Sequence, residues 1–394
     1  MRQNKPQTIN QIAQEVYKIV GQEALKSFAK IIYIAGGIDG KQNSASNFND
    51  KSAQEILDTR LSLEQLDANF QENIFKKYRG QGVERQNISS GSFGGEDRSA
   101  IIECFKQVGF IDKVEPSRKN YDEVLVLGAT MIGVKSRIDD LKVLDLEYKK
   151  VSFLTGERAL WMDSPSDNFE DDKIAQNLLV QRCDNDEVTC ASIDEKMQEI
   201  KNLHKQEKGS DISVGDLRKA VEEFYTKQYL EPKRQKFPTE ADGIEYMFKK
   251  DQFFASRNVR CIYAKKSPEK PRVDTLDTVN EWFKEFEEVA KSDVSPSYNC
   301  IVISDQPHLK AQSQAFTLIS DTKNIEIEVV AKGYENPKAE LLLTEMAGTL
   351  NRKKIMLERF AQQDSKSSSL PSLAPSSGSA SGSLPKEPLI QNSL

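Results

Sequence analysis

The stretch YDEVLVLGATMIGVKSR (121–137) begins a repeating pattern that decides the fold. Its apolar run VLVL (124–127) is followed by a small-residue loop and then by a helical pattern around residues 137–144. Near-continuous apolar strands that alternate with amphipathic helices are typical of a parallel sheet covered on both faces. The sequence therefore predicts an α/β fold with a parallel sheet of about five strands and helices on both faces. The four later apolar runs are VSFL (151–154), VRCIYA (259–264), CIVIS (300–304) and IEIEVV (325–330).

Residues 1–118, which precede this pattern, have a different distribution of apolar side chains. Apolar side chains recur at helical spacing in three segments, and Gly-rich loops separate these segments. The sequence therefore predicts a mainly helical N-terminal region over residues 1–118. The three helical segments are 8–34, 51–78 and 96–108.

The α/β domain is assigned to residues 119–362, and its last element is a long helix at 337–362. This domain contains an oversized connection at 163–236, with a helix at about 214–229. A connection of that length is typical of a functional lid or an inserted subdomain. Residues 363–394 are rich in Ser, Pro and Gly and have no face that could pack, which predicts a disordered tail.

Composition limits the classes of protein to which the chain can belong. The formal net charge is −6 and the pI is about 5.4, so there is no overall field to attract nucleic acid or an anionic membrane. No apolar run reaches the roughly 18 residues of a membrane span, and no secretory signal is recognisable, so we expect a cytoplasmic protein. The two histidines, His204 and His308, exclude a His-rich metal site and leave a carboxylate-only site open.

The loops that follow the apolar runs are the candidate binding elements, because open parallel sheets bind ligands at the carboxyl ends of their strands. These loops combine small or hydroxyl residues with charged ones, which suits a phosphate or carboxylate held by backbone N–H groups. The first loop, GATMIGVKS (128–136), is not predicted to be a nucleoside-triphosphatase loop, because Val134 separates its second glycine from Lys135. The four loops are Gly128-Ala129-Thr130, Thr155-Gly156-Glu157-Arg158, Lys265-Lys266-Ser267 and Ser304-Asp305-Gln306-Pro307-His308.

Three charged or ionisable residues have two interpretations each. Arg137 could reach back to an anion above Gly128, or it could pair with Asp139 or Asp140 on its own helix. Glu240 could face a ligand, or it could simply be favoured by the dipole of the helix that it begins. His308 could be a neutral general base beside anion-binding amides, or an exposed residue in the first turn of a helix.

The order of these motifs resembles the YdcF-like family, which includes SanA- and ElyC-type bacterial proteins. The resemblance covers about residues 121–330. It rests on VLVLGAT with an arginine soon after it, LTGER, PTEADGIEYM, VDTLDTVNEW and VISDQPHLKAQSQAF. One departure is Ala311, which stands where an arginine commonly follows the histidine by three positions.

The resemblance implies a Rossmann-like fold and a nucleotide-like cofactor such as S-adenosylmethionine. It also implies a pocket in which His308 and Glu240 take part in catalysis. The residues that it implies as cofactor-binding are Gly128, Arg137, Thr155, Gly156, Thr275 and Thr278, and the strand-end rule adds Thr130 of the first loop.

Two functional hypotheses remain open at this point. In the first, the protein binds a small anionic or nucleotide-like ligand and acts as a transferase or hydrolase, with His308 as acid or base. In the second, it is a non-catalytic binding protein whose helical region and insertion engage a protein partner.

Overall fold

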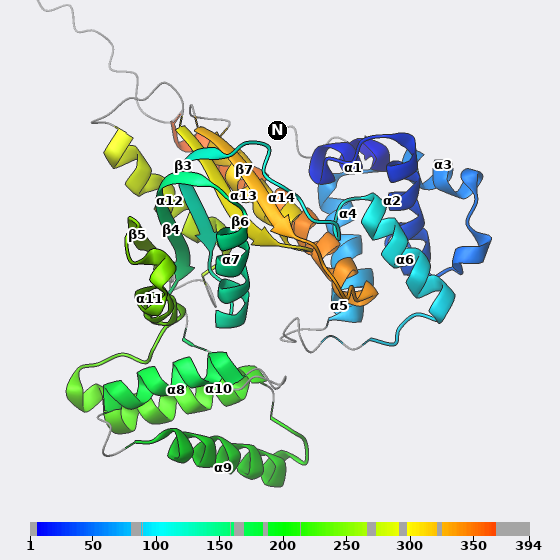
Figure 1. The fold of residues 1–394 in the computed structure, drawn as a ribbon. Helices are drawn as coiled ribbons and strands as arrows, with labels where there is room; N and C mark the ends of the chain where they lie inside the picture. Colours follow the sequence, from blue (N-terminus) through cyan, green and yellow to red (C-terminus); the bar gives the residue numbers. More distant parts are fainter. Residues whose placement is uncertain are drawn as a thin grey trace, which may run out of the picture.

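The computed structural model describes residues 6–79, 88, 90–157, 159–160, 169–183, 188–212, 214–265, 273–290, 298–320 and 325–367. Within them lies a five-stranded sheet whose strands are all parallel, which confirms the predicted fold class (Figure 1). The strands lie in the order β5-β4-β3-β6-β7. They are β3 (Asn120–Leu127), β4 (Glu147–Gly156), β5 (Val259–Ala264), β6 (Tyr298–Asp305) and β7 (Ile325–Lys332).

The strand order reverses at β3. The chain first builds outward from β3 to β4 and β5, and it then returns to the other side of β3 to add β6 and β7. The middle of β3 is completely inaccessible at Val124, Leu125 and Val126, as expected for the central strand of a sheet covered on both faces. Because β3 and β6 are adjacent and parallel, their carboxyl ends lie side by side at the reversal, the usual ligand position in open α/β sheets.

Helices cover both faces of the sheet, as predicted. One face packs against α7 and α11 in a core that includes Phe153, and the opposite face packs against α12 and α13 in a core that includes Trp282. The bounds are α7 (Met131–Val143), α11 (Glu240–Lys250), α12 (Thr275–Ala290) and α13 (Leu309–Ser320).

Helix α7 begins earlier than the sequence pattern around residues 137–144 predicts. The Thr130 side chain accepts a hydrogen bond from the Gly133 backbone N–H at 3.3 Å, which caps the first turn at Met131. Because of this early start, the N-terminus of α7 comes immediately after the loop that follows β3.

The insertion forms helices that pack on one another beyond α11 (Figure 1). Buried residues of these helices, Leu179 and Tyr225 among them, share one core with Ile244 of α11. The helix predicted at about 214–229 corresponds to α10 and the π-helical turn that follows it. The elements are α8 (Phe169–Cys183), α9 (Cys190–Lys208), α10 (Val214–Tyr225) and the turn Thr226–Leu230.

The N-terminal region is helical, as predicted, and has its own apolar core around Phe28, Phe70 and Phe105. None of the helices in the described part of the chain combines the length and apolar character needed to span a bilayer. The elements are α1 (Ile9–Tyr17), α2 (Gln22–Ala35), α3 (Asp50–Asp58), α4 (Leu63–Phe70), the π-helical turn Gln71–Phe75, α5 (Lys76–Tyr78) and α6 (Gly95–Gln107), with a short β1–β2 pair formed by Gln7–Thr8 and Arg60–Leu61.

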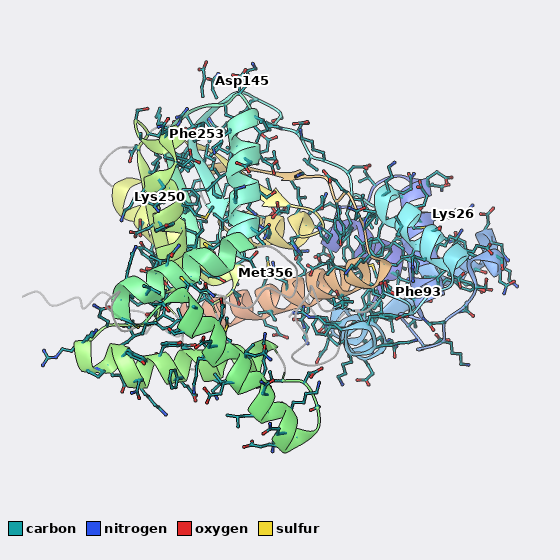
Figure 2. All side chains as sticks on the ribbon, turned by 60° about the horizontal axis from the view of Figure 1, so that its bottom comes forward. Lys26, Phe93, Asp145, Lys250, Phe253 and Met356 are labelled. Atoms are coloured by element: carbon teal, nitrogen blue, oxygen red, sulfur yellow. The ribbon has the colours of Figure 1, made fainter. Side chains whose placement is uncertain are left out.

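The last helix, α14 (Ala339–Ser367), joins this region to the sheet. Leu342, Met346 and Leu350 are completely buried in the core of the N-terminal helices, whereas Met356 packs in the core that contains Trp282. Figure 2 labels Met356 on α14, between the two parts. The helix runs past the predicted end at residue 362 into the segment predicted to be disordered, and residues 368–394 lie outside the described residues.

A second contact between the two parts comes from α13. Lys310 Nζ donates to the Tyr17 carbonyl at 2.7 Å, and Gln314 Nε2 donates to the Val16 carbonyl at 2.8 Å. Both carbonyls belong to the last turn of α1, where helix C=O groups lack intrahelical partners. Side chains of the α/β domain therefore cap a helix of the N-terminal region.

Candidate functional site

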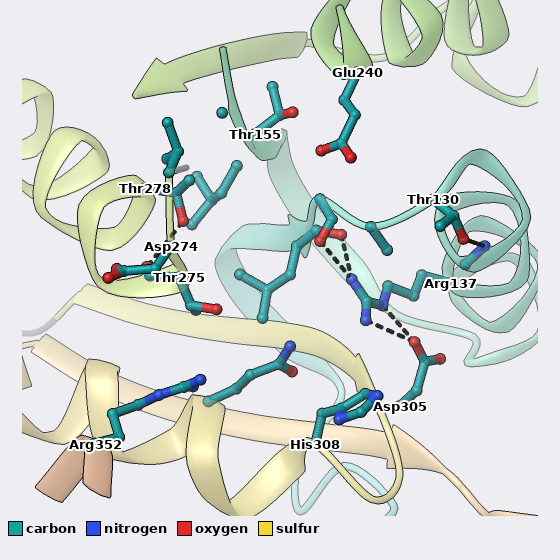
Figure 3. A pocket seen from close by; sticks show the side chains of 18 of the residues that line it. Thr130, Arg137, Thr155, Glu240, Asp274, Thr275, Thr278, Asp305, His308 and Arg352 are labelled. Carbon is teal, nitrogen blue, oxygen red and sulfur yellow. Dashed lines mark hydrogen bonds and ion pairs between the residues drawn. The ribbon is translucent and has the colours of Figure 1, made fainter. Parts of the chain in front are cut away.

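A cavity of about 470 Å³ lies at the carboxyl ends of the strands. All nine candidate catalytic and cofactor-binding residues line this one cavity (Figure 3), whereas Glu157 and Lys265 of the predicted loops line a different one. The nine come from loops and helices far apart in the chain, which the parallel sheet brings to the same edge. They are Gly128, Thr130, Arg137, Thr155, Gly156, Glu240, Thr275, Thr278 and His308.

Three of the helices that begin at the cavity have a side-chain cap. Thr130 caps α7, Thr239 caps α11, and Asp274 caps α12 by accepting from Asp277 N–H at 3.0 Å. The first turns of α11 and α12 carry acidic residues that already compensate the positive helix ends, whereas the first turn of α7 carries none. The α7 end is therefore the more suitable of the three for an anion.

Arg137 contacts neither of the partners considered on its own helix. Its Nε and Nη2 lie 2.8 and 2.7 Å from Asp305 Oδ2, and its Nη1 donates to the Leu127 carbonyl at 2.6 Å and to the Gly128 carbonyl at 3.2 Å. The side chain is almost fully buried, at 2% exposure. Arg137 therefore does not pair with Asp139 or Asp140. Its side chain instead bridges the ends of β3 and β6 at the strand reversal and fixes them there.

The two predicted glycines allow close packing between neighbouring segments. A Cβ atom at Gly128 would meet the Leu154 carbonyl oxygen at 2.9 Å, and one at Gly156 would meet Val273 Cβ at 2.6 Å. Both approaches are shorter than ordinary van der Waals contact, so a side chain at either position would displace the neighbouring loop or strand. These glycines therefore shape the cavity floor.

Thr155 is the polar residue of the cavity whose bonding is incomplete. Its side chain is 1% exposed, and its Oγ1 has no hydrogen-bond partner among the residues that the structure describes. The neighbouring Thr278, also buried, donates its hydroxyl to the Thr275 carbonyl at 2.9 Å. Because an unpaired buried hydroxyl costs free energy, Thr155 Oγ1 marks a position where a bound molecule could supply a partner.

Glu240 extends from the first turn of α11 into the cavity, near Thr155 (Figure 3). It is largely buried, at 8% exposure. The capping role at this terminus belongs to Thr239 and Asp242, which bond reciprocally. Glu240 is therefore not needed as the cap, and its carboxylate is placed to accept hydrogen bonds from a ligand.

His308 lies just before α13, after a cis bond between Gln306 and Pro307. Its backbone is held from both sides, because its N–H donates to the Asp305 carbonyl at 2.9 Å and its carbonyl accepts from Gln312 N–H at 3.0 Å. The imidazole lines the cavity, and its Nδ1 lies 2.9 Å from Glu345 Oε2. The sequence interpretation placed His308 in the first turn of a helix, whereas α13 begins one residue later, at Leu309. The side chain faces the cavity.

Residues from α14 and the loop before it form a wall of the cavity that the sequence interpretation missed. Arg352 Nη1 donates to the Ala311 carbonyl at 2.9 Å, so a cation does lie beside the residue where one was expected from the family. Burial raises the pKa of the Tyr334 hydroxyl, which stays neutral near pH 7. Tyr334 and Lys338 lie in a loop that no motif marks, and Leu341 and Arg352 belong to a helix whose apolar face packs in the N-terminal core. The wall consists of Tyr334, Lys338, Leu341 and Arg352.

Within the part of the chain that the structure describes, no group of three or more His, Cys, Asp or Glu side chains is arranged to hold a metal ion. The cavity instead offers hydroxyl groups, the N-termini of α7 and α13 without acidic residues in their first turns, and charged groups of both signs. Comparisons of the chain with protein-family models, with curated proteins and with solved structures found no match.

Proposed function

We propose that this protein binds a small anionic or nucleotide-like ligand in the cavity at the carboxyl ends of β3, β4 and β6. The observation that carries the proposal is the unpaired Thr155 hydroxyl, buried at 1% exposure in a cavity at the strand reversal. Support for an anionic group comes from the N-terminus of α7 and from Arg352 on the opposite wall. S-adenosylmethionine is one candidate ligand, in keeping with the proposed membership of the YdcF-like family and a cytoplasmic location.

The same geometry supports proton transfer by His308. Its imidazole lines the cavity, and its Nδ1 is paired with a carboxylate, an arrangement in which a base is oriented by a third group. A histidine so placed can accept a proton from a ligand hydroxyl or an attacking nucleophile. We therefore propose a transferase or hydrolase, with His308 as acid or base and Glu240 as an acceptor for ligand hydrogen bonds.

Thr155→Val tests the proposal, because the substitution removes the hydroxyl and keeps the shape. The unliganded variant should melt at the wild-type temperature or slightly above it, since no hydrogen bond is lost. Ligand binding should weaken by about 1 to 2 kcal/mol, roughly tenfold in Kd. Thermal shift against a panel of nucleotides and S-adenosylmethionine measures both quantities.

Thr278→Val is the matched control, because it makes the same change in the same cavity at a hydroxyl that already donates to the Thr275 carbonyl. It should lower the melting temperature of the unliganded protein. His308→Ala and Glu240→Gln should weaken binding in the same panel. If no molecule of the panel stabilises the wild type, the proposed function is wrong, and if Thr155→Val binds as the wild type does, the hydroxyl is not part of the site.

A further inference from the structure

The pairing of His308 with Glu345 has a consequence for the chemistry of the imidazole. A neutral imidazole carries one N–H, and an ionised carboxylate can only accept a hydrogen bond. With Nδ1 at 2.9 Å from Glu345 Oε2, an ionised Glu345 places the proton of the neutral ring on Nδ1. Nε2 then holds the lone pair, so the carboxylate decides which nitrogen can take up a proton.

Glu345 itself is held firmly. Its side chain is 5% exposed, against 19% for His308. On either side of it along α14, Leu342 and Met346 are completely buried in the core of the N-terminal helices. Tyr17 of α1 also donates its hydroxyl to the Met346 carbonyl at 2.9 Å. The carboxylate is therefore placed in part by the packing of α14 against the N-terminal helices.

We infer that Glu345 is a positioning residue for His308, and that the N-terminal helical region forms part of the cavity site through α14. Glu345 holds the imidazole with the proton on Nδ1 and the lone pair on Nε2. When Nε2 takes a proton from the ligand, the resulting imidazolium keeps its hydrogen bond to the Glu345 carboxylate, which stabilises the new positive charge. The role in proton transfer rests on the proposed function, whereas the pairing and the tautomer exist without a ligand.

The chain allows a direct test, because His204 is its only other histidine. In full-length protein labelled with ¹⁵N-histidine, the ring nitrogen shifts report the tautomer of each imidazole at a pH where both rings are neutral. The wild type should show His308 with a protonated Nδ1. Glu345→Ala should convert His308 into a mixture of both tautomers, and Glu345→Gln should keep the wild-type tautomer, because the amide oxygen can still accept from Nδ1–H.

Two controls separate positioning from a general loss of structure. Glu358→Gln changes an exposed carboxylate on the same helix and should leave His308 unchanged. The His204 signals, from α9, should be the same in all variants. A wild-type His308 protonated on Nε2, or a tautomer unaffected by Glu345→Ala, overturns the inference.

If Glu345→Ala does not fold, the wild-type tautomer and its retention in Glu345→Gln decide the question. Failure of every ligand in the thermal-shift panel would contradict the proposed function alone, because the tautomer measurement needs no ligand.

Discussion

Glu123 lies in the central strand β3 with a completely buried carboxylate. Oε2 accepts hydrogen bonds from Trp282 Nε1 at 3.2 Å and Tyr298 OH at 3.1 Å and lies 3.2 Å from Lys150 Nζ. Oε1 is bonded to Ser152 and lies 3.3 Å from Arg260 Nη2. A buried charge with this many partners ties four strands to the helix above them, and it lies away from the cavity. Substitution of Glu123 should therefore change the stability of the protein and not its ligand binding.

Glu123→Ala should lower the free energy of unfolding by about 3 to 5 kcal/mol, because it leaves two cations and three hydrogen-bond donors without their acceptor. Urea unfolding measures the change. Glu326→Gln is the control: this strand glutamate also pairs with an arginine, Arg118, but its side chain is 60% exposed, so the loss should stay below about 1 kcal/mol. Equal losses of unfolding free energy in the two variants would contradict the expectation that burial makes the contacts of Glu123 more stabilising than those of Glu326.

At the scale of elements, the contact between α13 and α1 depends on a partly buried lysine. Burial lowers the pKa of Lys310 to about 8, while its ammonium donates to the Tyr17 carbonyl and lies near the Phe110 ring. The unfolded chain keeps its lysine protons up to a pKa of about 10.4. Between these values the unfolded state binds more protons, so the contribution of Lys310 to stability rises with pH.

Comparison with Lys310→Met isolates this effect. The difference in the free energy of unfolding, wild type minus variant, should increase between pH 8 and about pH 10, with a slope of at most about 1.4 kcal/mol per pH unit. Urea unfolding at a series of pH values measures it. Lys106→Met, at an exposed position on α6, should give a difference that does not change with pH, and a flat difference for Lys310→Met would contradict the assignment.

At the scale of the whole molecule, α14 gives the N-terminal helices and the sheet a shared element. Leu350 is completely buried in the N-terminal core, while Met356 on the same helix packs in the core with Trp282. The N-terminal helices and the sheet share α14, and side chains of α13 cap α1, so the two regions should unfold together. We therefore expect one cooperative unfolding transition for both.

Leu350→Ala should destabilise the protein by about 2 to 5 kcal/mol through the cavity that it leaves in the N-terminal core. In a Trp161→Phe background, Trp282 fluorescence reports the sheet, and far-UV circular dichroism reports all helices. The urea midpoint should fall by the same amount for both signals. Ile355→Ala, at a 37% exposed position on α14, should change it little. A lower midpoint by circular dichroism with an unchanged Trp282 transition would show that the two parts unfold separately.

The strands were predictable because each is an apolar run with charged or small residues at its ends. VRCIYA (259–264) coincides with β5, and CIVIS (300–304) lies within β6. The cavity residues were predictable as a group, because parallel strands must bring their carboxyl ends to one edge. Helix ends were less predictable: α7 begins at Met131 through a cap formed by Thr130, a local hydrogen bond that apolar periodicity does not report.

The individual roles within the cavity could not be predicted. Arg137 has acidic neighbours on its own helix, and only the adjacency of β3 and β6 shows that Asp305 is its partner. Thr155 and Thr278 are alike in sequence, and only their surroundings leave one hydroxyl bonded and the other unpaired. The type of a residue at a strand end therefore predicts that the residue lies at the cavity much better than it predicts which hydrogen bonds the side chain makes.

The sequence by itself determined the α/β pattern, the helical N-terminal region and the set of loops that meet at one edge of the sheet, because these follow from local periodicity and from the geometry of parallel strands. Only the tertiary structure decided that α14 closes the cavity. Its residues Glu345 and Arg352 lie 37 and 41 positions from the residues that they contact, His308 and Ala311. Contacts at that separation depend on how whole helices pack, which no local pattern encodes.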